Sequence, residues 1–131
     1  MVIIDTSVWI DYFSHRPSTA SSKVDELLLT SEAYVALPII AEVLSGQMTR
    51  DTYRLIYDGL MSLPRLDLEW NGLEAWLDVA NLAQTAYTKR LPASGVIDRM
   101  ILACAVQHKA KLLTHDIKLK KLAQTVQLSF Q

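Results

Sequence analysis

The chain has 131 residues, of which 50% are hydrophobic and 21% are charged, values that are ordinary for one compact globular domain spanning residues 1–131. No apolar stretch approaches the roughly 20 residues needed to cross a bilayer, and the N-terminus lacks the pattern of a signal peptide. The single cysteine, Cys104, cannot form an internal disulfide and is predicted to be a small buried hydrophobe. The net charge of -1 does not by itself indicate a nucleic-acid binder, and a reducing cytoplasm is the expected compartment.

Apolar runs alternate with helical spacing in the first half of the chain. Val2–Ile4 is β-branched and ends at an acid, the pattern of a buried parallel strand. The expected elements that follow are a helix over Ser7–Phe13, a loop over His15–Ser22 entering a helix near Ser21, a strand over Tyr34–Leu37, a helix over Ile39–Leu44 begun by Pro38 and ended by Gly46, and a helix over Thr49–Ser62. The last helix would bury a face formed by Tyr53, Ile56, Tyr57 and Leu60.

The second half continues the alternation after Pro64. The expected elements are a strand over Arg65–Glu69, a long helix capped by Asn71, a loop over Lys89–Gly95, a helix over Ile97–Lys109, a strand over Lys111–Thr114, a helix from Asp116 to about Ala123, and a closing strand over Val126–Phe130. The long helix would bury Leu73, Trp76, Leu77, Ala80, Ala83 and Tyr87. Strands separated by helices predict an α/β fold of three layers, with a central, mostly parallel sheet flanked by helices.

Four acidic residues interrupt this apolar pattern. Asp5 directly follows the first strand, Asp116 lies at the end of the strand Lys111–Thr114, and Asp98 begins a helix. Glu42 lies among aliphatic residues one turn into the Pro38 helix, where a carboxylate is costly unless it is paired or bound to a metal. Because sites in open α/β sheets form beyond the carboxyl ends of the strands, we expect these four side chains to converge.

Such a cluster would need a cation. Two carboxylates about 4 Å apart repel by about 4 kcal/mol at an effective dielectric near 20. Oxygen ligands without nearby histidine or cysteine favour Mg²⁺, or Mn²⁺, over zinc. Without these four acids the chain has 13 basic and 10 acidic residues, a charge of +3 that is compatible with a phosphate-bearing substrate. The hypothesis is that Asp5, Asp98 and Asp116 hold the metal and that Glu42 orients or deprotonates a water for phosphodiester hydrolysis.

The segments around these acids resemble a known family. Val2-Ile-Ile-Asp5-Thr-Ser-Val-Trp-Ile-Asp11 is similar to the opening of a PIN domain of the VapC branch. Ile39–Leu44, Asp98–Ala103 and Leu112–Asp116 resemble the further acidic motifs of that family, in the same order, and the resemblance covers essentially the whole chain. The chain departs from the family pattern at Arg99, where a small or apolar residue is more usual, and after Asp116, where a further acid is replaced by Ile-Lys-Leu-Lys-Lys.

The resemblance implies a PIN fold, Mg²⁺-dependent endoribonuclease activity, homodimerisation, and inhibition by a cognate antitoxin. An antitoxin arginine could pair with the acidic pocket, because a guanidinium binds carboxylates bidentately. Thr114 and Arg99 are candidate substrate-binding residues, and Thr114 could instead bond a site carboxylate. Lys118, Lys120 and Lys121 either contact RNA phosphates or form a solvated helix face.

Other interpretations compete with this one. Taken singly, Asp98 and Asp116 are ordinary acids at helix starts, and Asp11 and His115 are expected at the surface. An aspartyl phosphatase would need an acid two residues after Asp5, where Ser7 stands, and a phospho-receiver would need an acidic pair there. A catalytically silent PIN-like interaction protein is compatible with every motif. The sequence identifies neither the RNA nor the number of metal ions.

Overall fold

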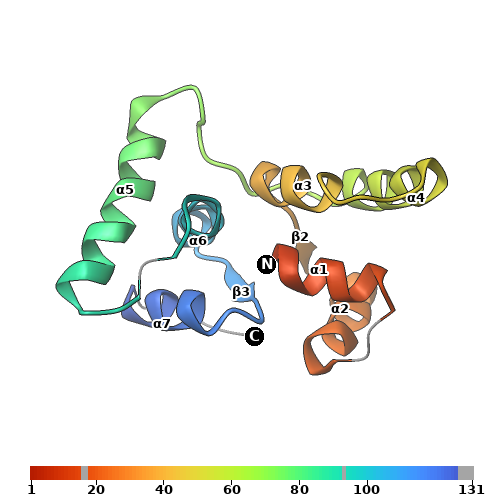
Figure 1. The fold of residues 1–131 in the computed structure, drawn as a ribbon, viewed down its shortest axis with the longest axis horizontal. Helices are drawn as coiled ribbons and strands as arrows, with labels where there is room; N and C mark the ends of the chain where they lie inside the picture. The colour runs from red at the N-terminus through yellow and green to blue at the C-terminus, as the bar shows by residue number, and fades with distance from the viewer. Residues whose placement is uncertain (16–17, 93, 127–131) are drawn as a thin grey trace.

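The computed structural model describes residues 1–15, 18–92 and 94–126. Three short parallel strands form the centre of the molecule (Figure 1). The strands are β1 (Val2–Ile4), β2 (Ala33–Tyr34) and β3 (Lys111–Leu113), and they lie in the order β2-β1-β3. Ile3 pairs with Tyr34 on one side and with Leu112 on the other. The expected α/β fold with a parallel sheet between helices is therefore confirmed.

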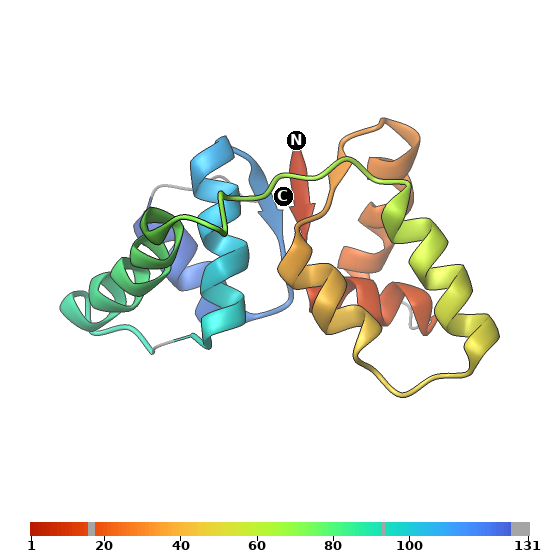
Figure 2. The ribbon, with the colours of Figure 1, turned by 90° about the horizontal axis from the view of Figure 1, so that it is seen from above.

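Seven helices surround this sheet within the described residues. They are α1 (Thr6–Phe13), α2 (Thr19–Leu29), α3 (Leu37–Leu44), α4 (Arg50–Met61), α5 (Leu73–Thr88), α6 (Val96–His108) and α7 (Ile117–Thr125). Helices α1 to α4 lie in the half of the molecule that contains β2 and α5 to α7 in the half that contains β3, and α3 contacts α6 where the two halves meet (Figures 1 and 2). The connection over residues 62–72 crosses between the two groups (Figure 2). Among the described helices, none is long and apolar enough to cross a membrane.

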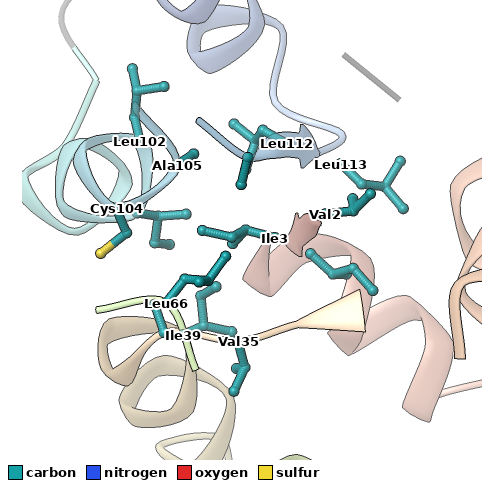
Figure 3. Packing of buried hydrophobic residues seen from close by; sticks show 14 of the residues in the cluster. Val2, Ile3, Val35, Ile39, Leu66, Leu102, Cys104, Ala105, Leu112 and Leu113 are labelled. Carbon is teal, nitrogen blue, oxygen red and sulfur yellow. The ribbon is translucent and has the colours of Figure 1, made fainter. Parts of the chain in front are cut away.

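Strand β1 is buried on both faces, as its β-branched composition predicts. Ile3 and Ile4 have no exposed surface, and they join one apolar cluster that also includes side chains of α3, α6 and β3 (Figure 3). Cys104 on α6 lies in this cluster as a free thiol. Burial raises the pKa of the Cys104 thiol to about 12, which confirms the prediction of an inert buried residue.

The segment around β2 differs from the prediction of a strand over Tyr34–Leu37. The strand ends at Tyr34 and α3 begins at Leu37, because Pro38 fits the first turn of a helix. The strand expected over Arg65–Glu69 is reduced to a single bridge between Val35 and Arg65. Asp67 then accepts the N–H of Leu37 at 2.8 Å, which caps α3 from a distant part of the chain and ends the strand-like pairing.

The predicted burial of α4 and α5 was partly wrong. Gly72, not Asn71, is the N-cap of α5. Its buried face consists of Ala75, Val79, Leu82, Ala83 and Ala86, so of the predicted face Ala83 alone is buried. These mostly small side chains allow close packing of α5 against α6, whereas Leu73, Trp76, Leu77 and Tyr87 are exposed. On α4, Ile56 and Leu60 are buried while Tyr53 and Tyr57 are exposed.

The remaining helices match their predicted positions to within a few residues. The strand expected over Val126–Phe130 lies outside the described residues except for Val126, which follows α7 in a turn. Two of the helix starts concern the candidate site directly, because Asp5 is the N-cap of α1 and Asp116 is the N-cap of α7.

Candidate active site

Asp5 is held rigidly at the end of β1. Its side chain is 3% exposed and accepts three hydrogen bonds. The backbone N–H of Thr6 donates to Oδ1 at 2.7 Å, and the hydroxyls of Ser7 and Thr114 donate to Oδ2 at 3.2 and 2.6 Å. Burial raises the pKa of Asp5, and these three donors oppose the rise. The three bonds leave lone-pair capacity on Oδ1, since each carboxylate oxygen can accept about two bonds.

Thr114 joins β3 to β1 at the site. Its hydroxyl donates to Asp5 and accepts the backbone N–H of Asp116 at 3.0 Å. The Asp116 carboxylate in turn accepts the backbone N–H groups of Lys118 and Leu119 at 2.8 and 3.3 Å, as an N-cap does. Asp116 is therefore both a helix cap and a charge near Asp5, and the two interpretations of this residue are compatible.

Glu42 reaches the site from α3. The hydroxyl of Thr6 donates to its Oε1 at 2.7 Å, so one oxygen of this partly buried carboxylate is fixed. Thr6 itself is 8% exposed and begins α1 directly after Asp5. One hydroxyl thus connects the first acidic motif to the second, 36 residues away in the sequence.

Asp98 completes the cluster from the first turn of α6. Burial raises the pKa of Asp98 from 3.8 to about 6. The negative charges of Asp5, Asp116 and Glu42 add to the rise, and a hydrogen bond with the backbone of Gly95 opposes it. Asp5, Asp116 and Glu42 therefore each lie within electrostatic reach of Asp98, and Asp116 also lies within reach of Asp5.

The four acidic side chains are of the type that binds a hard divalent cation. The four side chains offer oxygen ligands, and a dication would neutralise the negative charges that add to the burial-driven rise in the pKa of Asp98. Within residues 1–15, 18–92 and 94–126, however, no three acidic, histidine or cysteine side chains are close enough to hold a metal as they stand. Binding would require the carboxylates to move together, and Asp98 and Glu42 have fewer fixing contacts than Asp5.

The two candidate substrate-binding residues are placed differently. Thr114 faces the carboxylates, with its hydroxyl engaged by Asp5 and Asp116. The guanidinium of Arg99 donates from Nε to the carbonyl of Ser94 at 3.2 Å and from Nη1 to the carbonyl of Val79 at 2.9 Å. Arg99 thus ties the start of α6 to α5, and an RNA contact by Arg99 stays a prediction.

Sequence reasoning missed the supporting residues. Thr6 and Ser7 are hydroxyl residues directly after Asp5, and their adjacency to an acid at a strand end was the available signal. Asp11 and His115, both expected at the surface, are partly buried, and His115 Nε2 lies 3.0 Å from Asp11 Oδ2. That pair links α1 to the turn that carries Asp116.

Comparisons with known proteins identify the family of the chain. A family model described as the PIN domain matches residues 2–124. The chain is 28% identical over 130 residues to VapC ribonuclease Mb1587 of Mycobacterium bovis and to Ribonuclease VapC11 of Mycobacterium tuberculosis, covering 98% of this chain and 96% of each relative.

Solved structures share the fold. VapBC2 from Rickettsia felis, bound to a DNA fragment from its promoter, gives a TM-score of 0.74 at 19% identity and covers 100% of this chain and 98% of that one. VapBC-1 from nontypeable Haemophilus influenzae gives a TM-score of 0.72 at 22% identity and covers 100% and 97% of the two chains. Because the sequence identities are below 25%, these two matches show that the fold is shared.

Proposed function

The chain belongs to the PIN-domain family, and from that premise we propose that it is a Mg²⁺-dependent endoribonuclease that acts as the toxin of a toxin–antitoxin pair. Its curated relatives are named as VapC ribonucleases. The observation that carries the proposal is the convergence of Asp5, Glu42, Asp98 and Asp116, seen in the effect of the other three charges on the pKa of Asp98. A structural role alone does not explain why a fold would collect four mutually repelling carboxylates.

In this mechanism Asp5, Asp98 and Asp116 would hold the metal. When bound, Mg²⁺ or Mn²⁺ would lower the pKa of a water and neutralise charge on the phosphate oxygens. Glu42 is the proposed general base: with Oε1 held by Thr6, its Oε2 can accept the proton of the attacking water. Asp5 keeps its orientation through Thr6, Ser7 and Thr114.

The proposed partners follow from the same surfaces. A cognate antitoxin would place a basic side chain, such as arginine, against the carboxylates. Two of the solved structures with this fold are VapBC complexes. A homodimer is proposed through exposed apolar helix faces, of which Leu73, Trp76 and Leu77 on α5 are the most extended described example. A monomeric mass at micromolar concentration, without antitoxin, would contradict the dimer.

Cleavage of purified RNA tests the activity. Total RNA is incubated with the antitoxin-free protein in Mg²⁺, in EDTA, and with the variant Asp5→Asn. We expect discrete fragments that require both the metal and Asp5, and Asp58→Asn, on the exposed face of α4, as the matched control should cleave normally. Absence of cleavage by the folded wild-type protein would favour a silent interaction module.

A further inference from the structure

A polar pocket of about 290 Å³ lies beside the acidic site. Its wall includes Thr114, whose hydroxyl donates to Asp5 at 2.6 Å, and the neighbouring His115. The remainder of the lining comes mainly from the start of α2 and from Lys120 on α7. The pocket and the carboxylate cluster therefore share Thr114 as a common wall.

The charge of this pocket is opposite to that of the carboxylate cluster. Lys23 of α2 and Lys120 of α7 line it, and its described lining residues include no carboxylate. His115 is paired with Asp11, with 3.0 Å between Nε2 and Oδ2, so the two lysines supply the unbalanced charge of the wall. A pocket of this size and charge suits a small anion.

The start of α2 adds backbone donors. Ser18 is the N-cap, and its Oγ accepts the N–H of Ser21 at 2.9 Å, while its carbonyl accepts the N–H of Ser22 at 3.1 Å. Thr19 and Ala20 carry the first N–H groups of this 11-residue helix, and both residues line the pocket. Helix-start N–H groups together with lysines are a chemistry that binds phosphate.

We infer that this pocket is a second anion subsite, which holds a backbone phosphate of the RNA strand next to the phosphate that is cleaved. The inference rests on the proposed ribonuclease function. A strand crossing Thr114 would place one phosphate at the carboxylates and a neighbouring phosphate between Lys23 and Lys120.

The subsite would position the RNA strand relative to the carboxylates. Contacts to a phosphate that does not react fix the register of the strand and carry no base information. Binding of a phosphate in the pocket would offset the repulsion between the RNA and the four acids. This repulsion is strongest when no cation is bound to the acids. The expected signature is a change in KM and in salt dependence, with kcat unchanged.

Binding and cleavage of one single-stranded RNA test the inference. The double variant Lys23→Gln/Lys120→Gln is compared with the wild type and with Lys109→Gln, an exposed lysine at the C-terminal end of α6 that does not line the pocket. For the double variant, the slope of log affinity against log salt should fall by about 1, with KM raised several-fold. Lys109→Gln should match the wild type in slope, KM and kcat.

The outcomes separate the subsite from the nuclease. If the wild type cleaves RNA and the double variant keeps the same slope and KM, the subsite is wrong and the proposed function stands. An equal loss in Lys109→Gln would also overturn the subsite, because it would indicate diffuse surface charge. A folded wild type that neither binds nor cuts RNA would overturn both. Displacement of RNA by micromolar inorganic phosphate, lost in the double variant, would assign the pocket to the free ion instead of the strand.

Discussion

Replacing Asp98 with asparagine should stabilise the metal-free protein while it removes activity. The rise of the Asp98 pKa from 3.8 to about 6 corresponds to about 3 kcal/mol at 1.36 kcal/mol per pH unit. Because Asp98 is only partly buried, solvent screening reduces this to about 1.5 kcal/mol. Loss of a favourable charge at the start of α6 costs about 0.5 kcal/mol, which leaves a net gain near 1 kcal/mol for Asp98→Asn at pH 7.

The sign of this effect depends on pH. An acid whose pKa is raised in the folded state binds more protons there than in the unfolded chain between pH 3.8 and 6, so wild-type stability falls as pH rises through this window. Below pH 3.8 the carboxyl is protonated in both states, and Asp98→Asn should have little effect. Above pH 6 the full gain should be present.

Thermal unfolding in EDTA at several pH values measures the difference. A gain near 1 kcal/mol corresponds to a rise in Tm of about 3–6 °C for a domain of this size. The hydrogen bond with the backbone of Gly95 can be kept by the asparagine oxygen, so the variant isolates the charge. An equal or lower Tm for Asp98→Asn at pH 7, or a difference that does not change between pH 4 and 6, would refute the raised pKa of Asp98 on which this prediction rests.

Three further predictions concern the groups around the cluster. Thr114→Val should lower the free energy of unfolding by about 1–3 kcal/mol, because it removes one of the three donors to the buried Asp5 carboxylate and the acceptor of the Asp116 N–H. Thr114→Ser should retain most of this stability, and equal losses for the two variants in urea unfolding would contradict the role of the hydroxyl. Thr6→Val should reduce kcat by about 10–100-fold with little change in KM, because it removes the hydroxyl that holds Glu42, and Thr6→Ser should restore kcat. A rise in KM without a change in kcat would argue against Glu42 as the general base. Millimolar Mg²⁺ should raise the Tm of the wild type but not of Asp5→Asn, and an equal shift in both would place the ion elsewhere.

Two of the four acids of the candidate site stand out in the sequence because they break a local pattern. Asp5 ends an apolar strand, and Glu42 stands among aliphatic residues, so both are conspicuous without knowledge of the fold. The order of strands and helices then required the carboxyl ends of β1 and β3 to meet. Short sequence segments were therefore enough to predict where these acidic residues lie in the fold.

What could not be predicted depends on contacts between distant segments. The bond from Thr6 to Glu42 exists because α1 packs on α3, and the cap of α3 comes from Asp67 in the connection over residues 62–72. One face of α5 carries large apolar side chains, and another carries mostly small ones. Hydrophobicity alone predicts that the face with the large side chains is buried, and that prediction is wrong. The close approach of α6 selects the small residues.

Asp5 and Asp116 are each a helix cap as well as a proposed ligand, and asparagine caps a helix about as well as aspartate does. An asparagine at either position could keep a side-chain oxygen for the cap, and at position 5 the hydroxyls of Ser7 and Thr114 could rotate to accept from its amide. Aspartate and asparagine codons differ by one base. If the protein is a toxin, a single G-to-A change at codon 5 or 116 would yield a folded, harmless product that still occupies the antitoxin, so a lineage could disarm this gene without losing the protein.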